Sequence, residues 1–217
     1  MLGLRLVSCG LALAFCVFAH GNAAAAGRTH VYLLRGIFNV SVGLDALAQK
    51  LGRLGVAASV HGHGDGSSVA SEAIADYRGG RVRSIILIGH SLGAGAVVDV
   101  AHRLNEAGVP VSLLIALDPV SSASVPPNVR RAVDYYVGGS GVPLASEPGF
   151  HGQLQNVDVG REPGMDHMAV QETEKMHARM IGNVRAAMGA GAAPAGEKNR
   201  PPSAAPQKQA GTAPPPR

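Results

Sequence analysis

The sequence predicts an α/β fold with a mostly parallel sheet of about six strands and helices on both faces. Short apolar runs alternate along the chain with segments whose apolar residues recur at helical spacing, which is typical of parallel crossover connections. The central apolar runs lack the polar alternation of a half-exposed strand, as expected when helices cover both sides of a sheet. In such sheets, ligands bind beyond the carboxyl ends of the strands.

The individual elements follow from these periodicities. Strands are predicted over residues 30–34, 56–60, 85–88, 111–117, 131–137 and 154–159. Helices are predicted over residues 42–54, 67–77, 92–106 and 168–188. Glycines follow three of these helices, at Gly55, Gly79 and Gly108, where a flexible backbone is suited to end a helix.

The folded domain is expected to span residues 27–188, with both chain ends outside it. Residues 1–26 have the pattern of a cleaved secretory signal, with Arg5, an apolar run over 6–19 and small residues over 23–26. Both cysteines, Cys9 and Cys16, lie inside it, and a second interpretation makes Cys9 a lipidation site. We expect a periplasmic or secreted protein whose mature form has no transmembrane segment. Residues 189–217, rich in Ala and Pro, are expected to be a disordered tail.

The formal charge of +4 is carried by the chain ends. The tail holds a net charge of +3 and the signal +1, so the charges of residues 27–188 sum to zero. A nucleic-acid-binding domain would carry clustered basic residues on the domain itself. The basic pI is therefore no argument for a nucleic-acid partner, and we expect no such partner. The sequence leaves the oligomeric state open.

The segment most informative about chemistry is Gly89-His90-Ser91-Leu92-Gly93, a G-x-S-x-G sequence between a predicted strand and a predicted helix. A sharp turn in that setting exposes the serine at the carboxyl end of the strand, beside a helix N-terminus that favours negative charge. Side chains at the two glycines would collide with the neighbouring strand and helix. The alternative is that Ser91 only caps the following helix.

A serine nucleophile needs a base to take its proton and a carboxylate to orient that base. Asp118 ends the strand after the serine's helix, and His167 lies in the loop before the last helix. The predicted catalytic set is Ser91, Asp118 and His167, in this order along the chain. His151, in another late loop, is the main rival base, and Asp166 is either a partner that supports the catalytic residues from outside or an alternative acid.

Two further features bear on the site. The oxyanion formed on attack needs preorganised donors, and we expect the Leu92 and Ile37 backbone amides to supply them. The cluster His61-Gly62-His63-Gly64-Asp65 contains residue types that bind metals, but no second cluster completes a site, so a flexible substrate-side loop is favoured. No cofactor or metal is expected. His90 should point away from the site, and His177 is expected on the surface of the last helix.

These residues resemble the α/β-hydrolase superfamily over about residues 28–188. GHSLG is similar to the nucleophile turn of lipases, esterases and thioesterases, and ALDPV to the acid segment of some lipases. LLRGIF resembles the lipase oxyanion loop, with Arg35 where a histidine usually stands. The resemblance implies cofactor-free acyl transfer to water.

The sequence thus predicts an exported serine hydrolase that cleaves a carboxylic ester or thioester through an acyl-enzyme, with a small-molecule or lipid acyl substrate. Two alternatives remain open. The same triad could transfer the acyl group to another acceptor instead of water, or the chain could be a non-catalytic binding module that keeps the fold.

Overall fold

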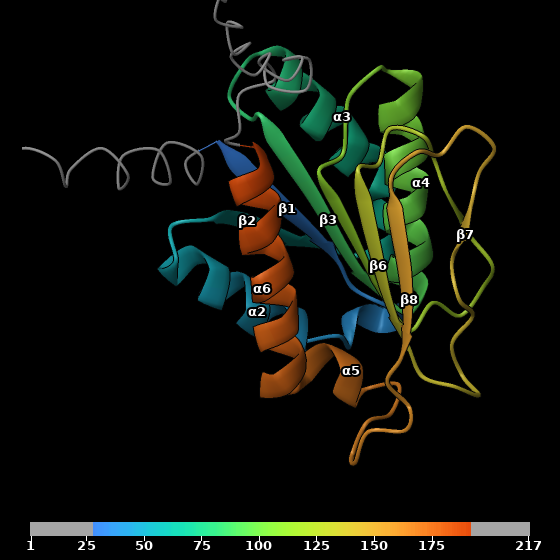
Figure 1. Cartoon of the computed structure of the whole chain (residues 1–217). Coiled ribbons are helices and arrows are strands. Elements are labelled where there is room, and N and C mark those ends of the chain that lie inside the picture. Colours follow the sequence, from blue (N-terminus) through green and yellow to red (C-terminus); the bar gives the residue numbers. More distant parts are fainter. Residues whose placement is uncertain (1–27, 192–217) are drawn as a thin grey trace, which may run out of the picture.

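The computed structural model describes residues 28–191, so the predicted signal and almost all of the predicted tail lie outside the described residues. Its main sheet has six strands, all paired in parallel, in the order β2-β1-β3-β4-β6-β8 (Figure 1). The predicted fold class is confirmed. The strands are β1 (Thr29–Leu34), β2 (Ala57–His61), β3 (Ser84–His90), β4 (Leu113–Leu117), β6 (Arg131–Tyr136) and β8 (Gln153–Asp158).

Helices cover both faces of the sheet, as predicted (Figure 1). On one face, α3 (Gly66–Arg78) and α4 (Leu92–Glu106) contribute to one apolar core cluster. On the other face, α2 (Gly43–Arg53) and α6 (Glu174–Gly191) contribute to a second cluster. The helical spacing of Leu44, Leu47 and Leu51 puts all three on the inner face of α2, where each is fully buried. Burial of each such side chain is worth about 1.5–3 kcal/mol.

The strand order places a reversal of winding direction between β1 and β3. From β1 the chain moves outward to β2, then returns past β1 to β3 and continues in the opposite direction to β8. The crossovers on the two sides of this point therefore diverge and leave room above the carboxyl ends of β1 and β3. The loop after β1 contains the 3₁₀ turn η1 (Ile37–Asn39), and β3 runs directly into the G-x-S-x-G segment.

The last helical segment differs from the single helix predicted over 168–188. A short helix, α5 (Ala169–Glu172), is separated from α6 by Thr173, whose backbone is extended at φ −68° and ψ 144°. Helix α6 then continues to Gly191, past the predicted end at residue 188. Two short strands, β5 (Ser124–Val125) and β7 (Ala145–Ser146), form a second, small parallel sheet that the sequence pattern did not predict.

The prediction of a surface position for His177 is wrong. Its side chain is 2% exposed. Its Nδ1 accepts a hydrogen bond from Lys50 Nζ at 2.7 Å, and its Nε2 donates to the Gln171 carbonyl at 3.0 Å. Helix α6 therefore presents His177 to α2 and α5.

No helix within residues 28–191 is long and apolar enough to cross a membrane.

Candidate active site

Ser91 occupies a sharp turn between β3 and α4, with the positive φ of 58° that non-glycine residues rarely adopt. Close backbone contacts hold the turn. A Cβ on Gly89 would lie 2.1 Å from the Gly93 carbonyl oxygen, and a Cβ on Gly93 would lie 2.1 Å from that of Leu34. The Ser91 amide donates to the Leu117 carbonyl at 2.9 Å, which ties the turn to β4. Such strain persists only where the surroundings impose it.

The structure brings Ser91, Asp118 and His167 into one hydrogen-bonded chain. His167 Nε2 lies 3.1 Å from Ser91 Oγ, and His167 Nδ1 lies 2.6 Å from Asp118 Oδ2. The three residues come from turns after β3, β4 and β8, so all lie at the carboxyl edge of the sheet. Distances of this size allow direct proton transfer between the serine hydroxyl and the imidazole.

Asp118 is fully buried, and donors from the segment after β6 hold its carboxylate. Oδ1 accepts from the Val137 amide at 2.7 Å, while Oδ2 accepts from the Ser140 hydroxyl at 2.7 Å as well as from His167. A Cβ on Gly141 would lie 2.0 Å from Oδ1, so only glycine fits there without displacing the carboxylate. These contacts fix the acid in one orientation toward the imidazole.

The expectation that His90 points away from the site is wrong, because its ring joins the loop after β1 to the segment that carries His167. The Gly36 amide donates to Ser41 Oγ at 2.9 Å, and Ser41 Oγ lies 2.7 Å from His90 Nδ1. His90 Nε2 lies 2.7 Å from the His167 carbonyl oxygen. Burial lowers the pKa of His90 to about 4, so the ring is neutral near pH 7. A neutral ring that donates from Nε2 must accept at Nδ1, so the Ser41 hydroxyl donates there.

One predicted oxyanion donor directly follows Ser91 in the chain, and the other lies in the loop after β1. Leu92 is the first residue of α4, and Ile37 is the first residue of η1. A Cβ on Gly36 would lie 3.0 Å from Ser91 Cβ, so the loop that carries the Ile37 amide packs directly against the nucleophile. Arg35, which replaces the lipase histidine in the resemblance, forms an ion pair with Asp45 of α2.

Other candidates from the sequence lie elsewhere. His151 lines a hollow at the amino ends of the strands, at the opposite edge from Ser91. Asp166 accepts hydrogen bonds from the Met168 and Ala169 amides just before and at the start of α5. The bond from the Ala169 amide contributes most to lowering the pKa of Asp166, followed by the bond from the Met168 amide.

The His61–Asp65 segment forms no cluster of ligands. His61 Nε2 lies 2.9 Å from Ser59 Oγ, His63 Nδ1 lies 3.3 Å from the Gly36 carbonyl, and Asp65 accepts from the Gly62 amide. Each group therefore has a separate local partner. Within residues 28–191, no three His, Cys, Asp or Glu side chains are grouped so that they could hold a metal ion.

Asp134 is a buried carboxyl group whose environment the sequence did not reveal. It lies within β6 and is fully buried. Its Oδ2 accepts from the Leu144 amide at 3.2 Å, while Oδ1 has no hydrogen-bond partner among the described residues. Burial raises the pKa of Asp134 to about 7, and the negative charge of Asp118 adds to the rise. Only its position in an apolar strand could have suggested this.

Exposed apolar side chains surround the candidate site. Of nine large apolar residues exposed within the described part of the chain, all but Leu54 lie within two residues of a group in the hydrogen-bond network above. Phe38 is the most exposed, at 85%, and its backbone has a positive φ of 53°. We call these eight the apolar rim: Ile37, Phe38, Val40, Val42, Leu92, Val120, Val142 and Met168.

Comparison with solved structures identifies the fold. Human thioesterase 2 matches 76% of this chain over 97% of its own, with a TM-score of 0.52 and 8% identity. An acetylxylan esterase matches 75% of this chain and 99% of its own at a TM-score of 0.47 and 13% identity. A Xanthomonas campestris pv. campestris protein is described only as a hydrolase of the α/β superfamily. It matches 70% of this chain over 98% of its own, with a TM-score of 0.43 and 19% identity.

No family model matches the sequence, and no curated protein matches it. The chain has the α/β-hydrolase fold, as its sequence motifs predicted. Identities this low show a shared fold alone, so the chemistry of the site rests on the geometry of this chain's own residues.

Proposed function

We propose that the protein is an exported serine hydrolase that cleaves a carboxylic ester or thioester through an acyl-enzyme intermediate. The observation that carries the proposal is the continuous contact from the buried Asp118 through His167 to the strained Ser91. Export rests on the composition of residues 1–26 alone.

In this mechanism His167 Nε2 takes the proton of Ser91 as the hydroxyl oxygen attacks the carbonyl carbon. Asp118 accepts a hydrogen bond from Nδ1 and stabilises the imidazolium that forms. The Leu92 and Ile37 amides stabilise the negative oxygen of the tetrahedral intermediate. His167 then protonates the leaving alcohol or thiol, and the acyl-enzyme remains.

Water completes the cycle by the same route in reverse. His167 removes a proton from the water as it attacks the acyl-enzyme, and returns that proton to Ser91 Oγ when the carboxylic acid leaves. The neutral His90, through Ser41 and the His167 carbonyl, holds the oxyanion loop and the base in fixed relation to Ser91. Fixed donors need no reorganisation as charge develops.

The apolar rim favours an apolar acyl group. Leu92 and Met168 are the direct chain neighbours of Ser91 and His167, and each keeps more than a third of its surface exposed. An aliphatic or aromatic acyl chain bound at Ser91 would cover such side chains, and each Å² of apolar surface removed from water is worth about 25 cal/mol.

The first test is covalent labelling of the protein with a fluorophosphonate probe. Wild type and a matched control, Ser68→Ala on the exposed surface of α3, should both react, and Ser91→Ala should not. Labelling of Ser91→Ala, or no labelling of folded wild type, would contradict the mechanism and favour a binding module.

A second step separates hydrolysis from acyl transfer. Aryl esters and thioesters of increasing acyl length are incubated with the protein, with and without an added alcohol, and the products are analysed. Free acid as the main product, with rates that rise from acetyl to longer acyl groups, is the expected result. A new ester as the main product would assign the protein as an acyltransferase.

A further inference from the structure

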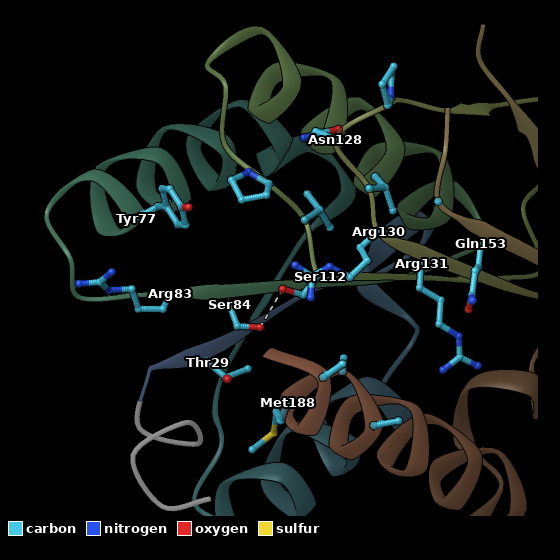
Figure 2. A pocket seen from close by; sticks show the side chains of 18 of the residues that line it. Thr29, Tyr77, Arg83, Ser84, Ser112, Asn128, Arg130, Arg131, Gln153 and Met188 are labelled. Atoms are coloured by element: carbon cyan, nitrogen blue, oxygen red, sulfur yellow. Dashed lines mark hydrogen bonds between the residues drawn. The ribbon is translucent and has the colours of Figure 1, made fainter. Parts of the chain in front are cut away.

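A hollow lies at the opposite end of the strands from the candidate active site. It has a volume of about 1240 Å³ and is lined by residues at or just before the first residues of β1, β3, β4, β6 and β8, together with the end of α6 (Figure 2). The hydrolase mechanism uses none of these residues.

The lining of this hollow is basic. It contains Arg28, Arg83, Arg130, Arg131 and His151, and no Asp or Glu. Within the described chain, none of the four guanidinium groups forms an ion pair or a side-chain hydrogen bond. Because residues 27–188 are neutral as a whole, this concentration of positive charge is a local feature.

Some other arginines of the same domain have carboxylate partners. Arg35 pairs with Asp45, Arg81 with Asp76, and one carboxylate, that of Glu162, holds Arg179 together with a lysine. Outside the hollow, Arg53, Arg78, Arg103 and Arg185 also form no ion pair among the described residues, so the hollow is distinguished by having several unpaired arginines in one place.

The basic side chains lie on neighbouring strands. The Arg83 amide donates to the Arg28 carbonyl at 2.8 Å, and these residues directly precede Thr29 and Ser84, which are paired across β1 and β3. Positive charges on neighbouring strands repel each other. An anion in the hollow would remove this repulsion.

The basic side chains are spread across the hollow. In Figure 2, Ser84, Ser112 and Arg130 lie across the middle of the hollow, with Arg83 toward one end and Arg131 toward the other. The two serine hydroxyls are 3.0 Å apart and add polar groups between the arginines. Separated guanidinium groups along one hollow suit a ligand with several anionic groups better than a single small ion.

We propose that this hollow binds a soluble ligand carrying two or more phosphate groups. A guanidinium group donates two parallel hydrogen bonds to a phosphate, and it stays charged at any physiological pH. Each arginine would engage one phosphate, with the serine hydroxyls donating to oxygens between them. The site is independent of Ser91 and holds whether or not the hydrolase proposal is correct.

Tripolyphosphate is the probe, measured by isothermal titration calorimetry and by thermal unfolding at low salt. Wild type should bind it at least tenfold more tightly than it binds inorganic phosphate, and binding should raise the Tm. The pair Arg130→Gln and Arg131→Gln should weaken binding tenfold or more. The matched control, Arg53→Gln with Arg103→Gln, removes the same charge from exposed positions outside the hollow and should weaken it less than twofold.

Three results would overturn the proposal. Wild type could fail to bind tripolyphosphate, the control pair could weaken binding as much as the hollow pair, or the protein could bind phosphatidylglycerol vesicles but not the soluble probe. Fluorophosphonate labelling of Ser91 is measured on the same variants and should be unchanged, because the two sites lie at opposite ends of the strands.

Discussion

Ser41→Ala tests whether the His90 connection positions the catalytic groups. Ser41 is fully buried and takes part in two hydrogen bonds, one from the Gly36 amide and one to His90 Nδ1. Alanine leaves both partners unsatisfied, which should lower the free energy of unfolding by about 1–3 kcal/mol. The protein should still fold, because the substitution creates no steric conflict.

The effect on rate follows from what Ser41 holds in place. The Gly36 amide is next to Ile37, whose amide is a proposed oxyanion donor, and complete loss of such a donor lowers kcat about 10²–10³-fold. Ser41→Ala displaces the loop without removing the donor, so we expect a fall in kcat of about tenfold to hundredfold, or roughly 1.4–2.7 kcal/mol. KM should change little, because the contact matters mainly in the transition state.

The assay is steady-state hydrolysis of a soluble aryl ester below the unfolding transition, with Ser59→Ala as the matched control. Ser59 also contacts two histidines, His30 at 3.0 Å and His61 at 2.9 Å, but belongs to β2, outside the triad network. If kcat of Ser41→Ala stays within twofold of wild type, or if Ser59→Ala loses as much, the positioning role of Ser41 and His90 is refuted.

Three further substitutions test the acid and its surroundings. Asp118→Asn should lower kcat by about three to four orders of magnitude at unchanged fold, since an amide cannot stabilise the imidazolium; circular dichroism controls for folding. Gly141→Ala should lower both Tm and kcat, because its Cβ would lie 2.0 Å from Asp118 Oδ1, whereas Gly52→Ala in α2, with open space around the Cβ, should slightly raise the Tm. The pKa of Asp134 is raised to about 7 in the folded state. Between about pH 4 and pH 7 the folded protein therefore keeps a proton on Asp134 that the unfolded chain has released. As a result, the contribution of Asp134 to stability falls as pH rises through that range. Urea titration should therefore show that Asp134→Asn raises the free energy of unfolding relative to wild type by up to about 4 kcal/mol at pH 8 and by little at pH 4. An equal difference at both pH values would contradict the inference that Asp134 is a buried neutral acid.

Local patterns were enough to predict where Ser91 and Asp118 lie. The strand, the two glycines and the helix that shape the Ser91 turn lie within about twenty residues of sequence, so their spacing already constrains the geometry. Asp118 follows from the rule that parallel strands present their carboxyl ends at one edge. His167 was indicated only by chain order, and the hydrogen-bond distances separate it from His151.

The supporting contacts could not be predicted, because they join segments distant in sequence. Ser41 and His90 are 49 positions apart, and the Ser140 hydroxyl reaches Asp118 across 22. No periodicity records such a pairing, since each residue taken alone is an ordinary loop or strand-end residue. His177 is different: with Met180 and Val184 it follows the buried stripe of α6, so the surface prediction overlooked the helical spacing.

The basic hollow lies at the amino ends of the strands and the candidate active site at their carboxyl ends, so the length of the strands sets the distance between the two sites. From Arg83 to Ser91, β3 and its flanking residues advance about 3.3 Å per residue, which gives roughly 26 Å. An anion at the amino edge is therefore several Debye lengths from the triad at physiological salt. Direct electrostatic influence on His167 is negligible at that separation. Any change in Ser91 labelling caused by tripolyphosphate would have to pass through the strands themselves, which are buried and packed on both faces, so none is expected.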